Sequence, residues 1–246
     1  MTQHAHTAQR IGASLRRYPA AHRAATLGVQ ALALARRNRQ INAYLEANER
    51  RYLRIGSGSH TDPGWLSVDL LPVRLDVVFM DGTKRFPLPS ASFDAIQCEH
   101  VIEHIGYESG LAMLRECHRV LRKGGALRLA TPNLELVRRL LEDPAGDPPV
   151  APYVKWSNET FGTAVELQDP HNAAFAANRL MREWGHTFIY DERTLRLALT
   201  AAGFSEIVRV APGESSHAEL SRVDRHEEEV GKASNELETL ALKATA

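Results

Sequence analysis

Two glycines and an aspartate are the first residues whose types and spacing suggest ligand chemistry. Gly56-Ser57-Gly58 directly follows Tyr52 to Ile55, an apolar stretch typical of a short strand. Glycines at a strand end let the backbone approach a ligand closely. Asp69 ends the next such stretch, where a carboxylate can accept hydrogen bonds from both ribose hydroxyls of a nucleoside. The pattern predicts a nucleoside site; a tight turn and an ordinary strand-end acid are the structural alternatives.

The distance between the glycines and the acid separates two classes of cofactor. Dinucleotide folds place a full helix there, with the acid about 20 residues after the glycines. Here Gly58 and Asp69 are eleven residues apart, and Pro63-Gly64 interrupts the interval. No standard helix fits, so the helix N-terminus that would hold a pyrophosphate is missing or reduced to a turn. The spacing favours a cofactor without phosphates, such as S-adenosylmethionine.

A second group of chemical side chains is His100-Val101-Ile102-Glu103-His104, which follows a predicted strand at 93–98. The order matches the H-x-x-E-H pattern of inverted zinc peptidases, in which two histidines one helical turn apart bind zinc and the glutamate activates water. A zinc hydrolase using His100, Glu103 and His104 is therefore one alternative. In the structural alternative, Glu103 and His104 cap or orient the loop beneath a substrate.

The elements that must position these residues alternate between strands and helices. Apolar stretches predict seven strands, at 52–55, 65–69, 76–80, 93–98, 126–130, 206–210 and 237–244. Helical spacing or helix-forming composition predicts helices at 24–48, 111–121, 134–141, 173–184 and 192–202. Asp191 is a suitable N-cap for the last of these helices, and Gly203 a suitable stop. Residues 212–235 are polar and predict a mobile loop. This alternation predicts an α/β fold, doubly wound around a mostly parallel seven-stranded sheet, with ligands at the carboxyl ends of the strands.

Length and charge set the domain organisation. We expect a basic helical extension at 1–50 and a single domain at 51–246, into which residues 134–185 are inserted as a cap after the fifth strand. The whole chain carries 30 basic and 30 acidic residues, yet residues 1–54 hold ten arginines and only two acids. This basic segment is typical of an arm that binds nucleic acid or an anionic membrane, and of a transit peptide. We favour a helix that docks on the acidic body, because the arginines lack interleaved aromatics.

The two cysteines, Cys98 and Cys117, exclude a disulfide scaffold and fit a reducing cytoplasm. No apolar run approaches the roughly 18 residues of a membrane span, and no signal-peptide core follows the N-terminus. We therefore expect a cytoplasmic protein.

Several segments in this order resemble the class I S-adenosylmethionine-dependent methyltransferases, specifically their broad type 11 small-molecule group. The segments are Leu53 to Gly58, Trp65 to Leu70, Asp81-Gly82, Phe86 to Pro89, Ser92 to Ile96, Glu99 to His104, Leu114 to Gly125, Gly185-His186, Tyr190-Asp191 and Ala202 to Phe204. The resemblance implies a Rossmann-like fold. Two positions depart from the family pattern: Arg54 stands where many members have an acid, and His60 replaces a third glycine.

The resemblance also implies cofactor contacts, residue by residue. Gly56, Ser57 and Gly58 would form the loop beside the methionine part of S-adenosylmethionine, and Asp69 would bind its ribose. Asp81 with Gly82 would lie near the adenine, although Asp-Gly is also a common turn pair. Glu99 and His100 would line the floor near the sulfonium.

The predicted function is methyl transfer by direct displacement to a small molecule or a glycan precursor, with no metal and no nucleic-acid partner. Positioning of the reactants would dominate catalysis. The candidates for a general base are His100, His104, His171 and His186, of which His100 is the first choice; His100 and His104 are predicted to be catalytic. The residues predicted to contact the acceptor are Tyr153, Trp156, His171, Trp184 and His186. The competing class is a non-catalytic binding module that has lost its cofactor.

Overall fold

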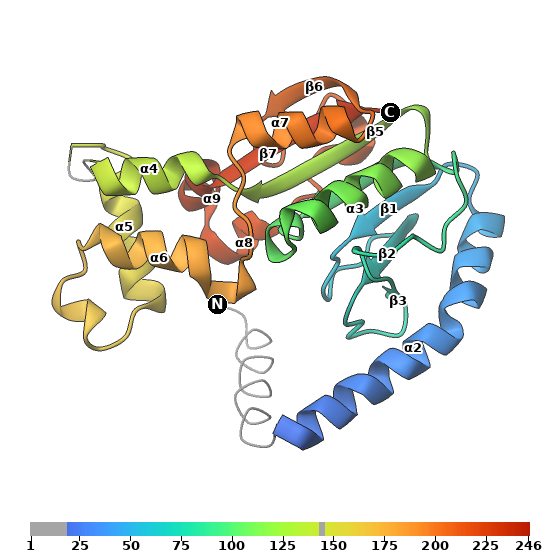
Figure 1. The fold of residues 1–246 in the computed structure, drawn as a ribbon, viewed down its shortest axis with the longest axis horizontal. Helices are drawn as coiled ribbons and strands as arrows, with labels where there is room; N and C mark the ends of the chain where they lie inside the picture. The colour runs from blue at the N-terminus through green and yellow to red at the C-terminus, as the bar shows by residue number, and fades with distance from the viewer. Residues whose placement is uncertain (1–18, 143–145) are drawn as a thin grey trace.

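The computed structural model describes residues 19–142 and 146–246 (Figure 1). The first eighteen residues of the predicted basic extension, and residues 143–145 of the predicted cap, lie outside this part of the chain.

A seven-stranded sheet forms the centre of the described chain (Figure 1). Its strands are β1 (Tyr52–Ile55), β2 (Trp65–Asp69), β3 (Val78–Phe79), β4 (Phe93–Glu99), β5 (Leu121–Pro132), β6 (Ser205–Val210) and β7 (Thr239–Thr245). The strand order is β3-β2-β1-β4-β5-β7-β6, and only β7 runs antiparallel to its neighbours. The chain crosses over between β1 and β4, which creates the switch point where such sheets bind ligands. The predicted fold class is confirmed.

Helices connect and flank the strands. The α-helices are α2 (Pro19–Ala47), α3 (Tyr107–Val120), α4 (Leu134–Glu142), α5 (Val150–Phe161), α6 (Ala173–Arg182), α7 (Glu192–Ala201), α8 (His226–Val230) and α9 (Lys232–Glu238). Short 3-10 turns are η1 (Ile102–His104), η2 (Glu166–Gln168), η3 (Glu183–Gly185) and η4 (Ala218–Leu220). No helix separates β1 from β2, as the Pro63-Gly64 interruption predicts. Within the described ranges, none of the helices combines the length and apolarity needed to cross a membrane.

The predicted N-cap and stop of α7 are confirmed, whereas the predicted bounds of α3 differ from those in the structure. Asp191 caps α7 by accepting the N–H of Thr194 at 2.7 Å, and Gly203 follows with φ of +104°. The predicted helix at 111–121 instead starts at Tyr107 and ends at Val120, and β5 begins at once at Leu121 rather than at 126. Leu121 extends β5 because it pairs with Phe93, across a register shift in β4.

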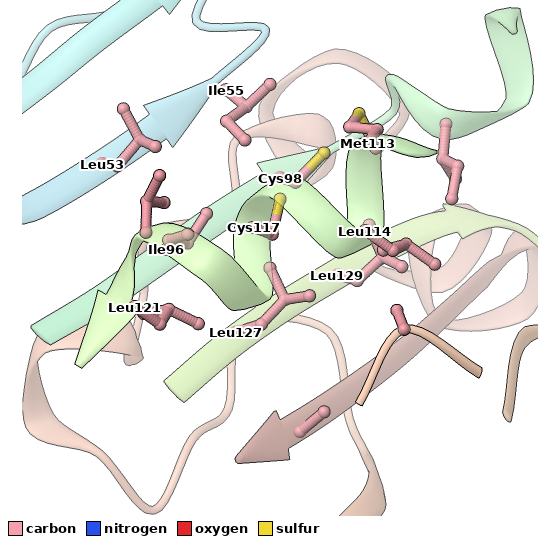
Figure 2. Close-up of a cluster of buried hydrophobic side chains, with 14 of the residues drawn as sticks. Leu53, Ile55, Ile96, Cys98, Met113, Leu114, Cys117, Leu121, Leu127 and Leu129 are labelled. Carbon is pink, nitrogen blue, oxygen red and sulfur yellow. The ribbon is translucent and has the colours of Figure 1, made fainter. Parts of the chain in front are cut away.

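One face of the sheet carries the main apolar core. Alternate residues of β1, β4 and β5 pack against α3, as Figure 2 shows. The residues that meet there include Leu53, Ile55, Ile96, Cys98, Met113, Leu114, Cys117, Leu127 and Leu129. Both cysteines are therefore buried and unpaired core residues.

The opposite face of the same strands carries polar side chains that are nevertheless buried. Arg54, Gln97 and Arg128 alternate with the core residues, and residues 211–238, here called the polar cover, lie over them. The guanidinium of Arg128 is fully buried, pairs with Asp224, and donates to the carbonyl oxygens of two further cover residues. The predicted mobile loop at 212–235 is wrong: this segment contains η4, α8 and α9 and shields the arginines from water.

Helix α2 docks on the body mainly through uncharged contacts. The hydroxyl of Tyr44 lies between the carbonyl oxygens of Tyr52 and Gly64, and its ring stacks on Phe93. Gln40 donates to the carbonyl of Leu75 at 2.8 Å. Ile41 of α2 is also buried in the main apolar core, so the predicted docking occurs, and the contacts named here, among the side chains that the structure describes, are uncharged.

Helices α4, α5 and α6 project from one end of the sheet, away from α2 (Figure 1). They share a second apolar cluster, which includes Leu136, Leu140, Val150, Val154, Ala177 and Leu180. Helices α8 and α9 lie between this group and the sheet (Figure 1).

Candidate functional site

Two cavities lie side by side at the carboxyl ends of the central strands. The glycine-loop cavity, about 290 Å³, is lined by residues 56–60, Glu99 and part of the polar cover. The aromatic cavity, about 340 Å³, is lined by residues of η1, α5, η3 and the polar cover. His100, His226 and Glu229 line both cavities. The two compartments therefore meet at these three side chains.

The glycine loop needs glycine at its first position. Gly56 has φ of +72°, and a Cβ there would overlap the side chain of Val101. Gly58 has φ of +54° but open space around it. The N–H groups of Gly56 and Ser57 both donate to the carbonyl of Val68, at 2.9 and 3.1 Å. The loop is thus fixed to β2, and the buried Oγ of Ser57 has no hydrogen-bond partner among the described residues.

Asp69 braces the glycine loop from the end of β2. One carboxylate oxygen accepts the N–H of Gly58 and the other that of Leu71, each at 2.8 Å. Each oxygen keeps acceptor capacity for a further partner. Asp69 does not line the glycine-loop cavity as the structure stands.

Asp81 and Gly82 lie away from both cavities. The carboxylate of Asp81 accepts from the N–H and the hydroxyl of Thr83, as in an Asp-initiated turn, and Gly82 lies against Met113. Of the residues predicted to contact the cofactor, the structure gathers Gly56, Ser57, Gly58 and Glu99 around one cavity, and Asp81 and Gly82 are not among them.

Glu99 and Arg54 anchor the polar cover to the strand ends. The carboxylate of Glu99 accepts the backbone N–H of Arg225 at 2.8 Å and that of His226 at 3.0 Å. Burial, followed by the nearby charge of Asp224, raises the pKa of Glu99 despite these bonds. Arg54, 3% exposed, donates to the carbonyl oxygen of Val223 in the cover at 3.4 Å and pairs with Asp62 at 2.6 Å.

His100 and Glu103 form a hydrogen-bonded pair on the wall between the cavities. His100 Nδ1 lies 2.9 Å from a carboxylate oxygen of Glu103, whose other oxygen accepts the hydroxyl of Thr131 at 3.0 Å. Burial lowers the pKa of His100, but the bond and charge of Glu103 outweigh it, so the net direction is upward. Burial opposes ionisation of Glu103, yet His100 lowers its pKa overall. The remaining ring nitrogen, Nε2, is buried and without a partner in the described chain.

The backbone of His100 is held in an unusual conformation. Its φ is +50°, a left-handed value that costs a non-glycine residue free energy and is often kept at functional sites. Its ring lies against that of His226, with centroids 3.9 Å apart.

His104 and His186 meet beside Glu103. The carbonyl oxygen of Glu103 accepts the N–H groups of Thr187 and Phe188, at 2.7 and 3.1 Å, and so joins the segment before α7 to η1. Ligand atoms of Glu103, His104 and His186 lie within 4.8 Å of one another.

The zinc-peptidase alternative expects His100 and His104 to converge on one metal ion, and the structure does not bring them together in this way. His100 precedes the short turn η1 and bonds to Glu103, so it does not share one helical face with His104. The third member of the converging group is His186, which lies 82 positions further along the chain.

Aromatic residues of the predicted cap form the outer wall of the aromatic cavity. Tyr153, Trp156, Phe161 and Trp184 contact one another in sequence, with ring centroids 5.5 to 5.6 Å apart. Among the residues predicted to contact the acceptor, Tyr153, Trp156, Trp184 and His186 line this cavity, whereas His171 is exposed and lines neither cavity.

Three titratable residues that line the aromatic cavity, His226, Glu229 and Glu238, were not predicted from the sequence. Glu238 accepts the hydroxyl of Tyr153 at 2.7 Å and lies 2.5 Å from Nε2 of His226. Burial, followed by the charge of Glu238, raises the pKa of Tyr153 well above its usual value. All three belong to the polar cover. His226 and Glu229 lie in the segment predicted to be a mobile loop, and Glu238 lies in the strand predicted at 237–244, although it ends α9 in the structure.

Comparison with known proteins adds a family match. Residues 60–129 match the family model described as a methyltransferase domain, of type 11. A "Probable S-adenosylmethionine-dependent methyltransferase", Rv3030 of Mycobacterium tuberculosis, is 40% identical over 69 residues, which are 28% of this chain and 23% of that protein. A similarly named protein of Mycolicibacterium smegmatis is 39% identical over the same length, 28% of this chain and 24% of that protein. The chain thus spans about a quarter of the length of the curated relatives it matches.

Solved structures that are similar to this chain include one described as a SAM-dependent methyltransferase from Archaeoglobus fulgidus. It has 18% identity and a TM-score of 0.45, and the match covers 93% of this chain and 100% of that one. Another is a structure described as PigF with SAH, with 16% identity, a TM-score of 0.43, and coverage of 82% and 53% of the two chains.

Proposed function

We propose that this chain, which contains a class I S-adenosylmethionine-dependent methyltransferase domain, transfers the methyl group of S-adenosylmethionine to a small-molecule or glycan-type acceptor. The observation that carries the proposal is the meeting of two cavities at His100. The glycine-loop cavity would hold the cofactor, and the aromatic cavity the acceptor.

The residues around the glycine-loop cavity fit such a cofactor. The loop presents backbone without side chains at Gly56 and Gly58, and the unpartnered hydroxyl of Ser57 offers a polar contact. No helix begins in the loop, so the site has no dipole end for a pyrophosphate, in keeping with a ligand that carries no phosphate. Asp69, next to the loop, would accept the ribose hydroxyls with its spare lone pairs.

When bound, S-adenosylmethionine supplies a methyl carbon for direct displacement, in which the acceptor atom bonds to carbon as the carbon–sulfur electron pair returns to sulfur. The chain's own contribution is to align the two ligands where the two cavities meet, with the acceptor atom against the methyl carbon, and to exclude water. His100 Nε2 faces no competing partner, so it would accept the proton that the acceptor loses. Glu103 would hold the imidazole in position through Nδ1.

The acceptor site would lie under the cap formed by residues 134–185. Its aromatic wall offers flat apolar faces of the kind on which sugar rings and other cyclic compounds pack. No basic groove with interleaved aromatics marks the described body, so we do not propose a nucleic-acid acceptor. The free cysteines, Cys98 and Cys117, support a reducing compartment, and we place the protein in the cytoplasm on that ground.

A non-catalytic binding module is the second candidate, favoured by one observation. Arg54 occupies the position where the resemblance expects an acid, and its ion pair with Asp62 joins two sides of the glycine-loop region. In this alternative the polar cover would permanently close the cofactor site.

Isothermal titration of the full chain with S-adenosylmethionine and its demethylated product separates the two. If the chain is the proposed enzyme, we expect saturable binding, and Asp69→Ala should weaken it. Asp76 is an exposed acid in the connection between β2 and β3, and Asp76→Ala should leave binding unchanged. Tighter binding of NAD, or no binding of either compound, would refute the proposal.

A further inference from the structure

Glu103, His104 and His186 converge, and the methyl-transfer proposal, which uses Glu103 only to orient His100, gives this convergence no role. Their ligand atoms lie within 4.8 Å of one another, and all three residues line the aromatic cavity. Two imidazoles and one carboxylate are a donor set that divalent transition metals such as Zn²⁺ use in catalytic sites. Bonds of about 2.1 Å to a common ion would place the ligand atoms within about 4.2 Å of one another, so small side-chain rotations would close the set.

The contacts behind these side chains resemble those that orient metal ligands. Nδ1 of His186 donates to the carbonyl of Leu180 at 2.6 Å, which leaves Nε2 as a lone-pair donor. The hydroxyl of Thr131 and Nδ1 of His100 bond to the two oxygens of Glu103. Ligating histidines and carboxylates are typically held by such outer hydrogen bonds, which fix ring orientation and ligand basicity.

Backbone hydrogen bonds also bring the three side chains together. Glu103 and His104 belong to η1, and the two bonds from Thr187 and Phe188 to the carbonyl of Glu103 place His186 beside them. The Thr187 hydroxyl adds a contact to the carbonyl of His104 at 3.2 Å. Glu103 is fully buried, whereas His104 is exposed and His186 partly exposed. The group therefore has a rigid buried ligand and two ligands on the open side.

We propose that Glu103, His104 and His186 bind one divalent transition-metal ion, whose remaining coordination positions face the aromatic cavity and take an oxygen atom of the acceptor. The inference that a metal ion binds is drawn from these three residues and their contacts. The inference that the ion contacts an acceptor rests on the proposed function. A bound ion would orient a hydroxyl-bearing acceptor at the junction of the two cavities and favour its ionised form. The acceptor class is then an oxygen nucleophile able to ligate a metal.

The test uses the tag-free full chain, stripped with a chelator and titrated with Zn²⁺ alone. We expect one equivalent to bind. His104→Ala and His186→Ala should each weaken binding by more than about 100-fold, because each removes a ligand, and Thr131→Val by about 10-fold, because it removes an outer contact. His171→Ala is the matched control, since His171 is an exposed histidine outside both cavities. Thermal melting of each variant checks that it folds, and the exposed position of His104 makes that variant the safest.

Co²⁺ in place of Zn²⁺ reports on the coordination positions. Its visible absorption should appear in the parent chain and in His171→Ala, and disappear in His186→Ala. Acetohydroxamate, a bidentate oxygen ligand, should shift the bands if open positions face the cavity; unchanged bands overturn that part of the proposal.

Binding of S-adenosylmethionine, measured in parallel, separates this inference from the proposed function. If the chain binds zinc but no cofactor, the metal-site inference is supported and the proposed methyltransferase function is refuted. A chain that binds cofactor, but takes up zinc less than stoichiometrically or equally well without His104 and His186, overturns the metal site.

Discussion

Removing the charge of Asp224 tests the buried link between the polar cover and the sheet. Asp224 precedes Arg225 and His226, whose N–H groups bond to Glu99 at the cofactor end of β4. Its carboxylate pairs with Arg128, which is fully buried on β5. Asp224→Ala should therefore destabilise the protein and loosen the wall shared by the two cavities.

The magnitude follows from what the variant leaves behind. Breaking a buried ion pair by removing one partner typically costs 3 to 5 kcal/mol, because an uncompensated charge stays buried. Arg128 keeps two carbonyl partners, from Ala211 and Glu214, so the lower end, about 3 kcal/mol, is expected. Replacing both partners, as in Arg128→Met with Asp224→Leu, removes the stranded charge and should cost much less than Asp224→Ala.

Urea unfolding followed by circular dichroism gives these free energies. An exposed pair, Arg138 with Glu135, is the control, and Glu135→Ala should change stability by less than about 1 kcal/mol. An Asp224→Ala cost below about 1 kcal/mol would show that the pair does not hold the cover, and would refute the reasoning.

The pH dependence of the same variant has a definite sign. Burial opposes ionisation of Asp224, but the hydrogen bond and charge of Arg128 lower its pKa below 3.8 overall. A depressed folded-state pKa gives stability that is present above pH 3.8 and is lost as pH falls through the folded value. The difference between parent and Asp224→Ala should hence be full near pH 7 and shrink in the acid range below pH 3.8.

Three further predictions concern the site. Gly56→Ala should destabilise the chain and abolish cofactor binding, because the added methyl overlaps Val101 at a positive φ. Gly58→Ala meets open space, so it should cost only the backbone strain of about 1 kcal/mol. Titration calorimetry with the cofactor and thermal melting check both variants. His100→Ala should lower turnover by about 10² to 10⁴-fold with cofactor affinity retained, and unchanged turnover would exclude it as the base. Trp184→Ala, at a side chain 55% exposed, should raise KM for the acceptor without altering the melting temperature or cofactor affinity, and a loss of cofactor affinity would contradict the division into two cavities.

Local signals in the sequence were enough for the sheet and most of its helices. Short apolar stretches, the Asp191 cap and the Gly203 stop act over a few residues, so they can be read without knowing the fold. The eleven-residue interval from Gly58 to Asp69 likewise predicted the absence of a helix between β1 and β2.

The cover of the second sheet face could not be read in this way. Alternation around Arg54 and Arg128 indicates one apolar and one polar face, and a polar face is ordinarily solvated. Whether an arginine is exposed or buried depends on its partner, and the partner of Arg128 is 96 positions away at Asp224. A polar segment such as 212–235 predicts a loop on composition alone, since nothing local shows that its charges meet buried counterparts.

By itself, the sequence determined the fold class, the position of the glycine loop and the place of His100 directly after a central strand, because these depend on hydrophobic periodicity and on local spacing along the chain. Only the tertiary structure decided that Glu103 and His104 converge with His186, and that Glu238 and His226 complete the same cavity. The physical reason is that strands and turns arise from interactions between neighbours in the chain, whereas a site is made by distant segments brought together. Here the bonds from Thr187 and Phe188 to Glu103, and the burial of two arginines beneath the polar cover, bring them there.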